Sequence, residues 1–304
     1  MGRIVIAGGT GFVGKKLIKK LANEHHDIIV LTRSASQSKT PMEHIKFVQW
    51  GTDSHEWKQW IDGADAIINL AGASVAQRWT QQHKQQIFDS RILFTNAIVD
   101  AIIKAKQPPP FFFSASAVGY YGDCQDAILT ENSANGDKSD FLANVCYEWE
   151  QSAMQAADYT RVVIGRIGIV LDPHEGALSK MLLPFRLGVG GPLGTGKQWW
   201  SWVHPDDVVG MILWAMGQNS MRGPMNITSP NPVTMKRFAK ELGNRLARPS
   251  FFPVPNFVLS LIMGESVVIA THSQNVIPEK AIRLGYKFQF SHLSECLTDI
   301  LGTR

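Results

Sequence analysis

Three glycines spaced three residues apart constrain this chain most, because they directly follow an apolar stretch near its start. The stretch is Ile4–Ala7, and the glycines are Gly8, Gly11 and Gly14. Glycine permits a tight turn, lets a backbone approach a phosphate, and allows a helix to pack closely on a strand. Residues Lys15–Leu21 then show the spacing of an amphipathic helix, whose N-terminal amides attract phosphates. The order strand, glycine turn, helix predicts a dinucleotide-binding site. The residues expected to contact the dinucleotide here are Gly8, Thr10, Gly11, Phe12, Val13 and Gly14.

The composition fits a globular chain and limits its partners. The 304 residues can bury one large α/β core and a smaller region. With 44% hydrophobic and 18% charged residues, the chain differs from disordered and fibrous proteins. The net charge of +4 is mild, and the basic cluster at residues 15–20 is typical of a solvated helix face. We therefore expect a small-molecule substrate and no nucleic-acid partner.

The cysteines indicate a reducing compartment. Cys124, Cys146 and Cys296 are far apart, odd in number and without the spacing of metal ligands. This pattern argues against disulfides and against a structural metal. Apolar stretches such as Phe257–Met263 are too short to span a bilayer, and the early first strand leaves no room for a signal peptide. We expect a cytoplasmic protein with no membrane partner.

Strand-like and helix-like segments alternate through the first half of the chain. Strands are expected at Ile4–Ala7, Ile28–Thr32, Ile45–Gln49, Ala66–Leu70, Phe111–Ser114 and Arg161–Leu171. Helices are expected between most of them, notably at Ser90–Lys106 and Phe141–Ala157. This alternation predicts an α/β fold of the Rossmann type, with a doubly wound parallel sheet whose carboxyl strand ends collect ligands.

The pattern changes near Pro173, where Gly- and Pro-rich loops and short elements begin. We expect a dinucleotide-binding Rossmann domain over residues 1–172 and a smaller, substrate-covering region over residues 173–304. Residues 202–230 are expected to return to the larger domain.

The end of the second strand indicates which cofactor binds. Thr32, Arg33 and Ser34 stand there. An acidic residue at this place holds a ribose 2′-hydroxyl in dinucleotide-binding folds, whereas an arginine accommodates a 2′-phosphate. A guanidinium can bind that phosphate through two hydrogen bonds. The sequence therefore predicts NADP(H) in preference to NAD(H), with an ordinary surface arginine as the alternative.

Later strands carry further candidates for cofactor contact. Leu70, Ala71 and Gly72 follow the fourth strand and would let the backbone pass beside the dinucleotide, and Ser114 closes the fifth strand. Arg166 lies inside the sixth strand, where a guanidinium is costly unless an anion or a carboxylate pairs with it. We expect Arg166 at the nicotinamide end of the cofactor.

Several motifs give the chain a resemblance to a known family. GGTGFVG, NLAG, SASAVGYYG and GTGKQ, followed by WVHPDD, occur in this order. They resemble the landmarks of the extended branch of the short-chain dehydrogenase/reductase superfamily. NLAGASVAQRWT, LLPFRLGVGGPLGTGKQ and the tail MGESVVIATHSQNVIPEKAIRLGYKF are similar to one atypical group in that branch. These are the "epimerase family" proteins, which are nucleoside-diphosphate-sugar epimerase-like.

The resemblance covers essentially the whole chain and implies further features. It places Arg91, at the end of the Asp89-Ser-Arg91 turn, against the dinucleotide, and Gln86 one helical turn earlier joins it. The segment at about 248–301 is peculiar to the family. The oligomeric state is left open, with a dimer as one alternative.

The catalytic pair of ordinary short-chain dehydrogenases is missing. In those enzymes a Tyr and a Lys four residues later share one helix face, opposite a Ser, and the Lys lowers the Tyr pKa. Ser116 matches the Ser, but the other two places fall at Leu142 and Cys146. None of the five tyrosines has a lysine four residues later.

Other groups near the strand ends are candidates for catalysis. Ser116 keeps a hydrogen-bonding role in this interpretation. Tyr120 and Tyr121 follow the fifth strand and could face the nicotinamide, or they could pack as aromatic residues. His204 could act as a general acid or base. Alternatively its stretch is structural, with one residue of Asp206–Asp207 capping a helix.

A tryptophan cluster offers one more substrate contact. Trp199, Trp200 and Trp202 could stack a flat substrate or a sugar, or they could pack in a core.

Two functions remain open from the sequence. The first is an NADP(H)-dependent oxidoreductase or epimerase-like enzyme, an atypical short-chain dehydrogenase/reductase acting on a small carbonyl or nucleotide-sugar-like substrate. The second is a non-catalytic NADP(H)-binding sensor or scaffold protein that has lost its proton-transfer pair.

Overall fold

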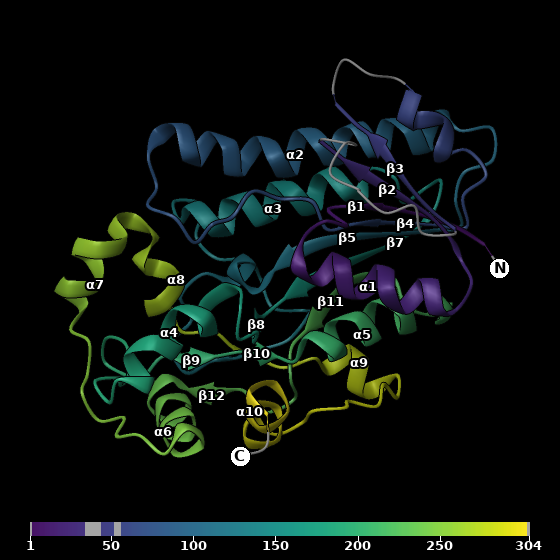
Figure 1. Ribbon diagram of the computed structural model, residues 1–304. Coiled ribbons are helices and arrows are strands. Elements are labelled where there is room, and N and C mark those ends of the chain that lie inside the picture. Colours follow the sequence, from purple (N-terminus) through teal and green to yellow (C-terminus); the bar gives the residue numbers. More distant parts are fainter. Residues whose placement is uncertain (1, 34–43, 52–55, 303–304) are drawn as a thin grey trace.

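A seven-stranded parallel sheet forms the centre of the molecule (Figure 1). The computed structural model describes residues 2–33, 44–51 and 56–302. From one edge to the other, the strand order is β3-β2-β1-β4-β5-β7-β11. These strands are β1 (Arg3–Ala7), β2 (Asp27–Thr32), β3 (Ile45–Gln49), β4 (Ala66–Asn69), β5 (Phe111–Ala117), β7 (Arg161–Ile167) and β11 (Gly223–Ile227). The predicted α/β fold with a Rossmann-type parallel sheet is confirmed.

Helices cover both faces of the sheet. In Figure 1, α2 (Gln81–Lys104) and α3 (Phe141–Met154) lie above it, and α1 (Phe12–Asn23) and α5 (Pro205–Gly217) lie below it. Alternate residues of β1 explain this arrangement. Ile4 and Ile6 join an apolar cluster that contains Leu17 and Leu21 of α1, whereas Val5 and Ala7 join a second cluster that contains Ile98 and Ile102 of α2. A strand buried on both faces reads as a continuous apolar run.

Two boundaries differ from the sequence expectation. The predicted strand Arg161–Leu171 is two strands, β7 and β8 (Ile169–Val170), because the chain leaves the large sheet at Gly168. A Cβ there would collide with the carbonyl of Ser201, so the crossing requires glycine. Helix α2 begins at Gln81 rather than Ser90. Thr80 caps it by accepting from His83 N at 3.1 Å, and the first turns are too polar to show helical periodicity.

Outside the large sheet, a third apolar cluster includes Leu171, Trp202 and Phe238, and a smaller fourth one includes Leu129 and Val276. The short strands pair as β8 with β10 (Trp202–Val203), β9 (Trp199–Trp200) with β12 (Val233–Thr234), and β6 (Ile128–Leu129) with β13 (Asn275–Val276). The later helices are α4 (Gly176–Arg186), α6 (Met235–Leu246), α7 (Asn256–Met263), α8 (Val268–Thr271), α9 (Glu279–Arg283) and α10 (Leu293–Leu301). Within the described residues, the 3-10 helices are η2 (Glu56–Trp60), η3 (Val118–Tyr121) and η4 (Gly264–Val267). The proposed domain boundary near residue 172 stays a prediction.

None of the helices in the described ranges is long and apolar enough to cross a membrane.

The side chain of Arg161 ties the start of β7 to the end of α5. Its guanidinium donates to four backbone carbonyls and lies 4.5 Å from the centroid of the Phe111 ring. The acceptors are the carbonyl oxygens of Ala215, Met216, Gln218 and Met221, at 2.7 to 3.2 Å. The last carbonyls of a helix lack intrahelical partners and carry partial negative charge, so a guanidinium stabilises them.

We predict that Arg161→Ala lowers the free energy of unfolding by about 2 kcal/mol, because hydrogen bonds from a charged donor to half-buried carbonyls are lost. Urea unfolding followed by circular dichroism measures this. The exposed Arg222 provides the matched control, and Arg222→Ala should change stability much less. Equal stability of the two variants would contradict the capping role.

Candidate functional site

The glycine turn brings three backbone segments into direct contact at the carboxyl end of the sheet. Gly8 has a φ of +77°, and a Cβ on it would lie 2.6 Å from the carbonyl carbon of Leu70. A Cβ on Gly14 would lie 2.5 Å from the Gly8 oxygen. A side chain at either place would therefore collide with backbone, which cannot move aside cheaply. The end of β1, the loop after β4 and the start of α1 meet here because these residues are glycines.

The N-terminus of α1 is available for an anion. Its N-cap is Gly11, which has no side chain to accept from the first-turn amides, and the first turn holds no acidic residue. Thr10 and Gly11 are exposed. Helix N-terminal amides without a cap carry partial positive charge and bind phosphate groups. The turn therefore fits the pyrophosphate of a dinucleotide.

The loop after β4 is held in place by polar contacts with α2. Asn69 Nδ2 donates to Thr95 Oγ1 at 3.0 Å, and Asn69 Oδ1 accepts from Ala71 N at 3.1 Å. Ala73 N donates to Ser90 Oγ at 2.9 Å. These bonds fix Leu70, Ala71 and Gly72 beside the glycine turn.

The end of β2 presents the residues predicted to select the cofactor. Thr32 is buried, and its carbonyl accepts from Trp50 N at 3.0 Å. Arg33 follows with an exposed side chain. Ser34 lies outside the described residues. Because β2 is the neighbour of β1, Arg33 and the glycine turn stand at adjacent strand ends.

The end of β5 holds a buried polar network. Ser116 Oγ donates to Glu150 Oε1 at 2.7 Å. Arg166 donates to the same carboxylate through Nε, at 2.9 Å, and through Nη2, at 2.8 Å. Ser116, Glu150 and Arg166 are all nearly inaccessible, and the predicted contact Ser114 is fully buried. A charged donor and a charged acceptor thus meet within the protein.

The structure gives Arg166 a partner within the chain, and its contact with the nicotinamide end of a cofactor stays a prediction. The sequence argument assigned its charge to the nicotinamide end of a cofactor, but Glu150 of α3 supplies the carboxylate that a buried guanidinium needs. The sequence analysis missed Glu150. A signal was present, since it stands four residues after Cys146 and therefore on the same helix face.

The two tyrosines differ in their surroundings. The Arg166 guanidinium carbon lies 3.5 Å from the ring centroid of Tyr120, which is half-buried. Tyr121 is 1% exposed, donates to Asn226 Oδ1 at 2.7 Å and accepts from Arg166 Nη1 at 2.9 Å. Burial raises the pKa of Tyr121 to about 12. The burial of Tyr121 fits the packing alternative, and catalytic roles for Tyr121 and Tyr120 both stay predictions.

Helix α3 turns apolar side chains toward the end of β5. A Cβ on Gly119 would lie 3.5 Å from Leu142 Cβ and 3.8 Å from Cys146 Sγ. The Cys146 thiol is within hydrogen-bonding reach of Ser116, and burial raises its pKa to about 12. The two positions matched to the Tyr and the Lys both lie beside Gly119, just after β5. Neither carries a group that transfers protons near neutral pH.

Arg91 lies between the loop after β4 and α3. A Cβ on Gly72 would be 3.0 Å from its guanidinium carbon, which also lies 5.1 Å from the centroid of the Trp149 ring. Arg91 Nη1 donates to Ile87 O at 3.1 Å. Gln86 is exposed and interacts with His83, with 3.3 Å between Oε1 and Nδ1.

His204 caps α5, and this corrects the expectation that an aspartate caps it. Its Nδ1 accepts from Asp206 N at 3.1 Å, so the histidine caps the helix, not either aspartate of the pair that follows it. Nε2 lies 3.2 Å from Asp299 Oδ2 on α10, and the Phe290 ring centroid is 3.8 Å away. Both ring nitrogens have partners and the side chain is 2% exposed, which fits the structural alternative, and a catalytic role for His204 stays a prediction.

The three tryptophans of the cluster differ in how deeply they are buried. Trp200 and Trp202 are buried in the third apolar cluster, so the packing alternative holds for them. Trp199 is half-buried and donates through Nε1 to Asp126 Oδ1 at 2.9 Å.

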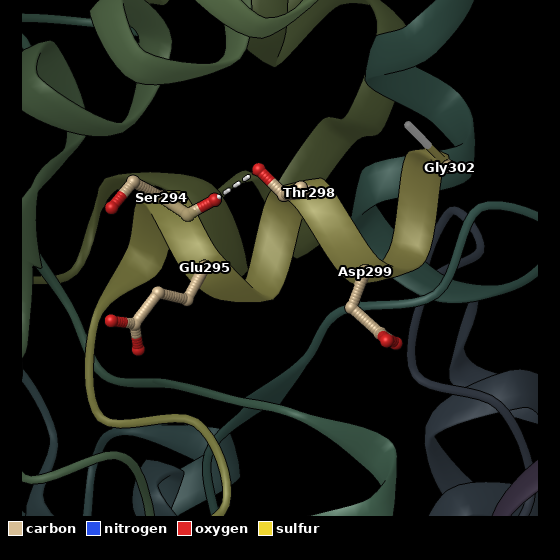
Figure 2. A pocket seen from close by; sticks show the side chains of 5 residues that line it. All are labelled: Ser294, Glu295, Thr298, Asp299 and Gly302. Carbon is tan, nitrogen blue, oxygen red and sulfur yellow. Dashed lines mark hydrogen bonds between the residues drawn. The ribbon is translucent and has the colours of Figure 1, made fainter. Parts of the chain in front are cut away.

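Two hollows lie apart from the glycine turn. One, of about 460 Å³, is lined by Tyr121 and Asp140 and by His272, whose Nδ1 lies 3.3 Å from Asp140 Oδ2. The other, of about 610 Å³, lies along α10 (Figure 2). Figure 2 shows that its side chains project from this one helix, where Thr298 Oγ1 donates to Ser294 O at 2.8 Å. Neither hollow includes a residue predicted to bind the cofactor.

We predict that acid destabilises the fold through His204. Burial lowers the pKa of His204 below its ordinary value near 6.5, against the opposing pull of Asp206 and Asp299. Because the folded pKa lies below the unfolded one, the fold holds the neutral ring, and this stability is lost as pH falls below about 6.5. His204→Asn can still cap the helix and cannot be protonated. Its free energy of unfolding, from urea titrations between pH 7.5 and 5.5, should fall less steeply than that of the unmodified chain. Parallel curves would contradict this assignment.

Comparisons with known proteins agree with the geometry. A family model described as the NAD dependent epimerase/dehydratase family matches residues 4–228, and one described as a domain of unknown function (DUF1731) matches residues 254–300. The chain is 39% identical to the epimerase family protein SDR39U1 homolog, chloroplastic, of Arabidopsis thaliana, over 98% of this chain and 86% of that protein. It is 38% identical to the epimerase family protein YfhF of Bacillus subtilis, over 99% and 98%.

A solved structure gives the same result. The human epimerase family protein SDR39U1 (isoform 2), whose structure was solved with NADPH, matches with a TM-score of 0.88 and 33% identity, over 98% of both chains. The chain therefore belongs to the NAD dependent epimerase/dehydratase family of extended short-chain dehydrogenases/reductases and carries the C-terminal DUF1731 domain.

Proposed function

We propose that this chain is an NADP(H)-dependent oxidoreductase or epimerase-type enzyme that acts on a small carbonyl or nucleotide-sugar-like substrate. The uncapped N-terminus of α1, enclosed by glycines that leave no room for a Cβ, carries the binding half of the proposal. The human relative, whose structure was solved with NADPH, supports the same cofactor. When bound, the cofactor would supply or accept hydride.

The preference for NADP(H) over NAD(H) rests on Arg33. Its side chain is exposed at the end of β2, next to the strand that leads into the phosphate-binding turn. A guanidinium at this place offers two parallel hydrogen bonds to a 2′-phosphate, and it gains less from a hydroxyl.

Arg33→Ala should weaken NADPH binding roughly tenfold, because one charge-assisted contact is lost, and should leave NADH affinity nearly unchanged. Isothermal titration calorimetry of both proteins with both cofactors measures the four affinities. Lys20→Ala, which removes an exposed charge at the far end of α1, provides the control. Equal affinities of the unmodified chain for NADPH and NADH would defeat the proposed preference.

Where the nicotinamide is expected, the chain offers hydrogen-bonding groups and an apolar surface, and it lacks the usual Tyr–Lys pair. Ser116 is oriented by Glu150, whose charge Arg166 balances, so its hydroxyl is fixed at the end of β5. Leu142 and Cys146 give the opposite wall an apolar surface. The half-buried Tyr120, beside Arg166, is more accessible than its neighbour Tyr121. We assign it the protonation of a reduced substrate.

Turnover tests the enzyme proposal. Purified protein with NADPH and a panel of carbonyls and sugar nucleotides should show oxidation of NADPH at 340 nm, or sugar epimers detectable by NMR. Tyr120→Phe should reduce the rate at least tenfold, since general acid catalysis typically contributes that much or more, and should preserve NADPH affinity. Exchange of hydride with no member of the panel would remove the enzyme proposal and leave the binding proposal standing.

A specific observation favours a second candidate. The thiol of Cys146 has a raised pKa, Arg166 and Glu150 neutralise each other, and Leu142 is apolar. A cofactor site lined by residues that do not transfer protons near neutral pH also suits a non-catalytic NADP(H) sensor or scaffold. In that case NADPH binds without turnover.

We also propose the cytoplasm as the location. The three free cysteines, of which Cys146 and Cys296 are buried, fit a reducing compartment. The plant relative is named chloroplastic, which is a statement about that protein alone.

A further inference from the structure

Large apolar side chains are exposed on two neighbouring segments of the C-terminal region. One segment is residues 183–189, at the end of α4 and in the loop after it, and the other is residues 249–263, which include α7. Together these two segments form the apolar face. Its side chains that are 58–75% exposed include Leu183, Leu187, Val189, Phe251, Phe257 and Leu261. Single exposed apolar residues are ordinary, whereas a contiguous patch of them marks an interaction surface.

Backbone contacts hold the two segments of the apolar face together. Arg248 donates through Nε to the carbonyl oxygen of Arg186 at 3.0 Å, and Val254 N donates to Pro192 O at 2.9 Å. Helix α7 begins two residues after Val254 and lies at the outer left edge of the molecule in Figure 1. Its exposed side chains therefore continue the apolar surface of the two loops.

Positive charge flanks the apolar face. Residues 183–197 and 235–264 contain this face and helix α6, which packs on α4. They hold seven Lys and Arg residues and a single acid, Glu241, which accepts from Arg237 Nε at 2.8 Å. Arg186 and Arg248 are exposed beside the apolar side chains. Such a surface attracts anions, and two copies joined through it would bring like charges together, so its charge fits a negatively charged partner and not a second copy.

The exposed side chains suit a lipid surface better than a protein. Interfaces between proteins are rich in Tyr and Trp and carry many hydrogen bonds. Residues 249–264 contain neither aromatic type, and their polar side chains are Ser250, Asn256 and Ser260. Helix α7 has eight residues and is about 12 Å long, so it cannot cross a bilayer. A short apolar helix with cations beside it instead lies in the plane of a membrane surface.

We propose that the apolar face inserts into the surface of a membrane that carries anionic lipids, with Arg186 and Arg248 at the level of the lipid headgroups. The expectation of no membrane partner rested on apolar stretches too short to span a bilayer, and that length does not limit binding at the surface. The anionic lipids of the cytoplasmic leaflet are compatible with the proposed location. The inference uses no residue of the proposed cofactor site and is independent of the proposed enzyme function.

Co-sedimentation with lipid vesicles tests the choice of partner. The unmodified chain should bind vesicles of phosphatidylcholine with about 30% phosphatidylglycerol at least tenfold more tightly than vesicles of phosphatidylcholine alone, because each cation near an anionic surface contributes roughly fivefold. Added salt should weaken the binding, since it screens these charges. Arg186→Gln should lower the affinity for the anionic vesicles about fivefold and leave the weak binding to phosphatidylcholine unchanged.

Substitutions on α7 test the apolar face itself. Leu261→Glu should reduce binding to the anionic vesicles at least tenfold, because it removes an inserted side chain and adds a charge that the lipids repel. Phe257→Ser adds no charge and should reduce binding about fivefold. Leu93→Glu provides the matched control, because it places the same change at a half-exposed site on α2 and should alter binding less than about twofold. All three side chains are exposed, so thermal unfolding should show no loss of fold.

The outcomes separate a lipid surface from the other occupants. Binding to neither type of vesicle, or equally to both, overturns the inference. An equal loss of binding in Leu93→Glu and Leu261→Glu also overturns it, since net charge alone would then decide. Analytical ultracentrifugation without lipid checks for a dimer, and a dimer that Leu261→Glu dissociates would assign the apolar face to a second copy instead. An acidic protein retained from a lipid-free extract by the unmodified chain, and lost in Leu261→Glu, would assign it to a protein partner. Selective binding to the anionic vesicles, lost in Leu261→Glu and kept in Leu93→Glu, supports the inference.

Discussion

The buried ion pair between Glu150 and Arg166 holds the reacting end of the molecule together. It joins α3 to β7, fixes the hydroxyl of Ser116 and places a guanidinium against Tyr120. Breaking such a pair by removing one partner typically costs about 3–5 kcal/mol, because the other charge stays buried. The pair therefore makes α3, β5 and β7 one rigid unit. The two charges of that unit balance each other, and Leu142 and Cys146 of the same helix are uncharged.

The frame of the fold could be predicted from the sequence, because strands buried on both faces are continuous apolar runs and the glycine turn has a strict spacing. Elements whose apolar residues show no regular spacing could not be predicted. The polar start of α2 at Gln81 and the two-residue strands after residue 168 leave no such signal. The side chains that pair across the fold could not be predicted from the sequence either. The pairing of Arg166 with Glu150 and the capping of α5 by His204 depend on which side chains the fold brings together.

Binding and chemistry are separated in this chain. The proposed phosphate site consists of closely spaced backbone segments and the uncapped N-terminus of α1. These features require glycines at the right places and no particular side chain. Proton transfer needs particular side chains with suitable pKa values, and Leu142 and Cys146 of α3 do not supply them near neutral pH. A site of this kind can keep its cofactor while its reaction changes, because the substitutions on α3 leave the turn after β1 untouched.

The position of β11 has a consequence for how the chain is made. This strand pairs with β7 at the edge of the large sheet, yet it lies at residues 223–227, well after the change of pattern near Pro173. During synthesis, the N-terminal part of the chain leaves the ribosome with the edge of β7 unpaired. An open strand edge invites pairing with other chains. The large sheet gains β11 only once some fifty further residues have emerged, so a cut near residue 172 would leave β7 as an unpaired edge strand.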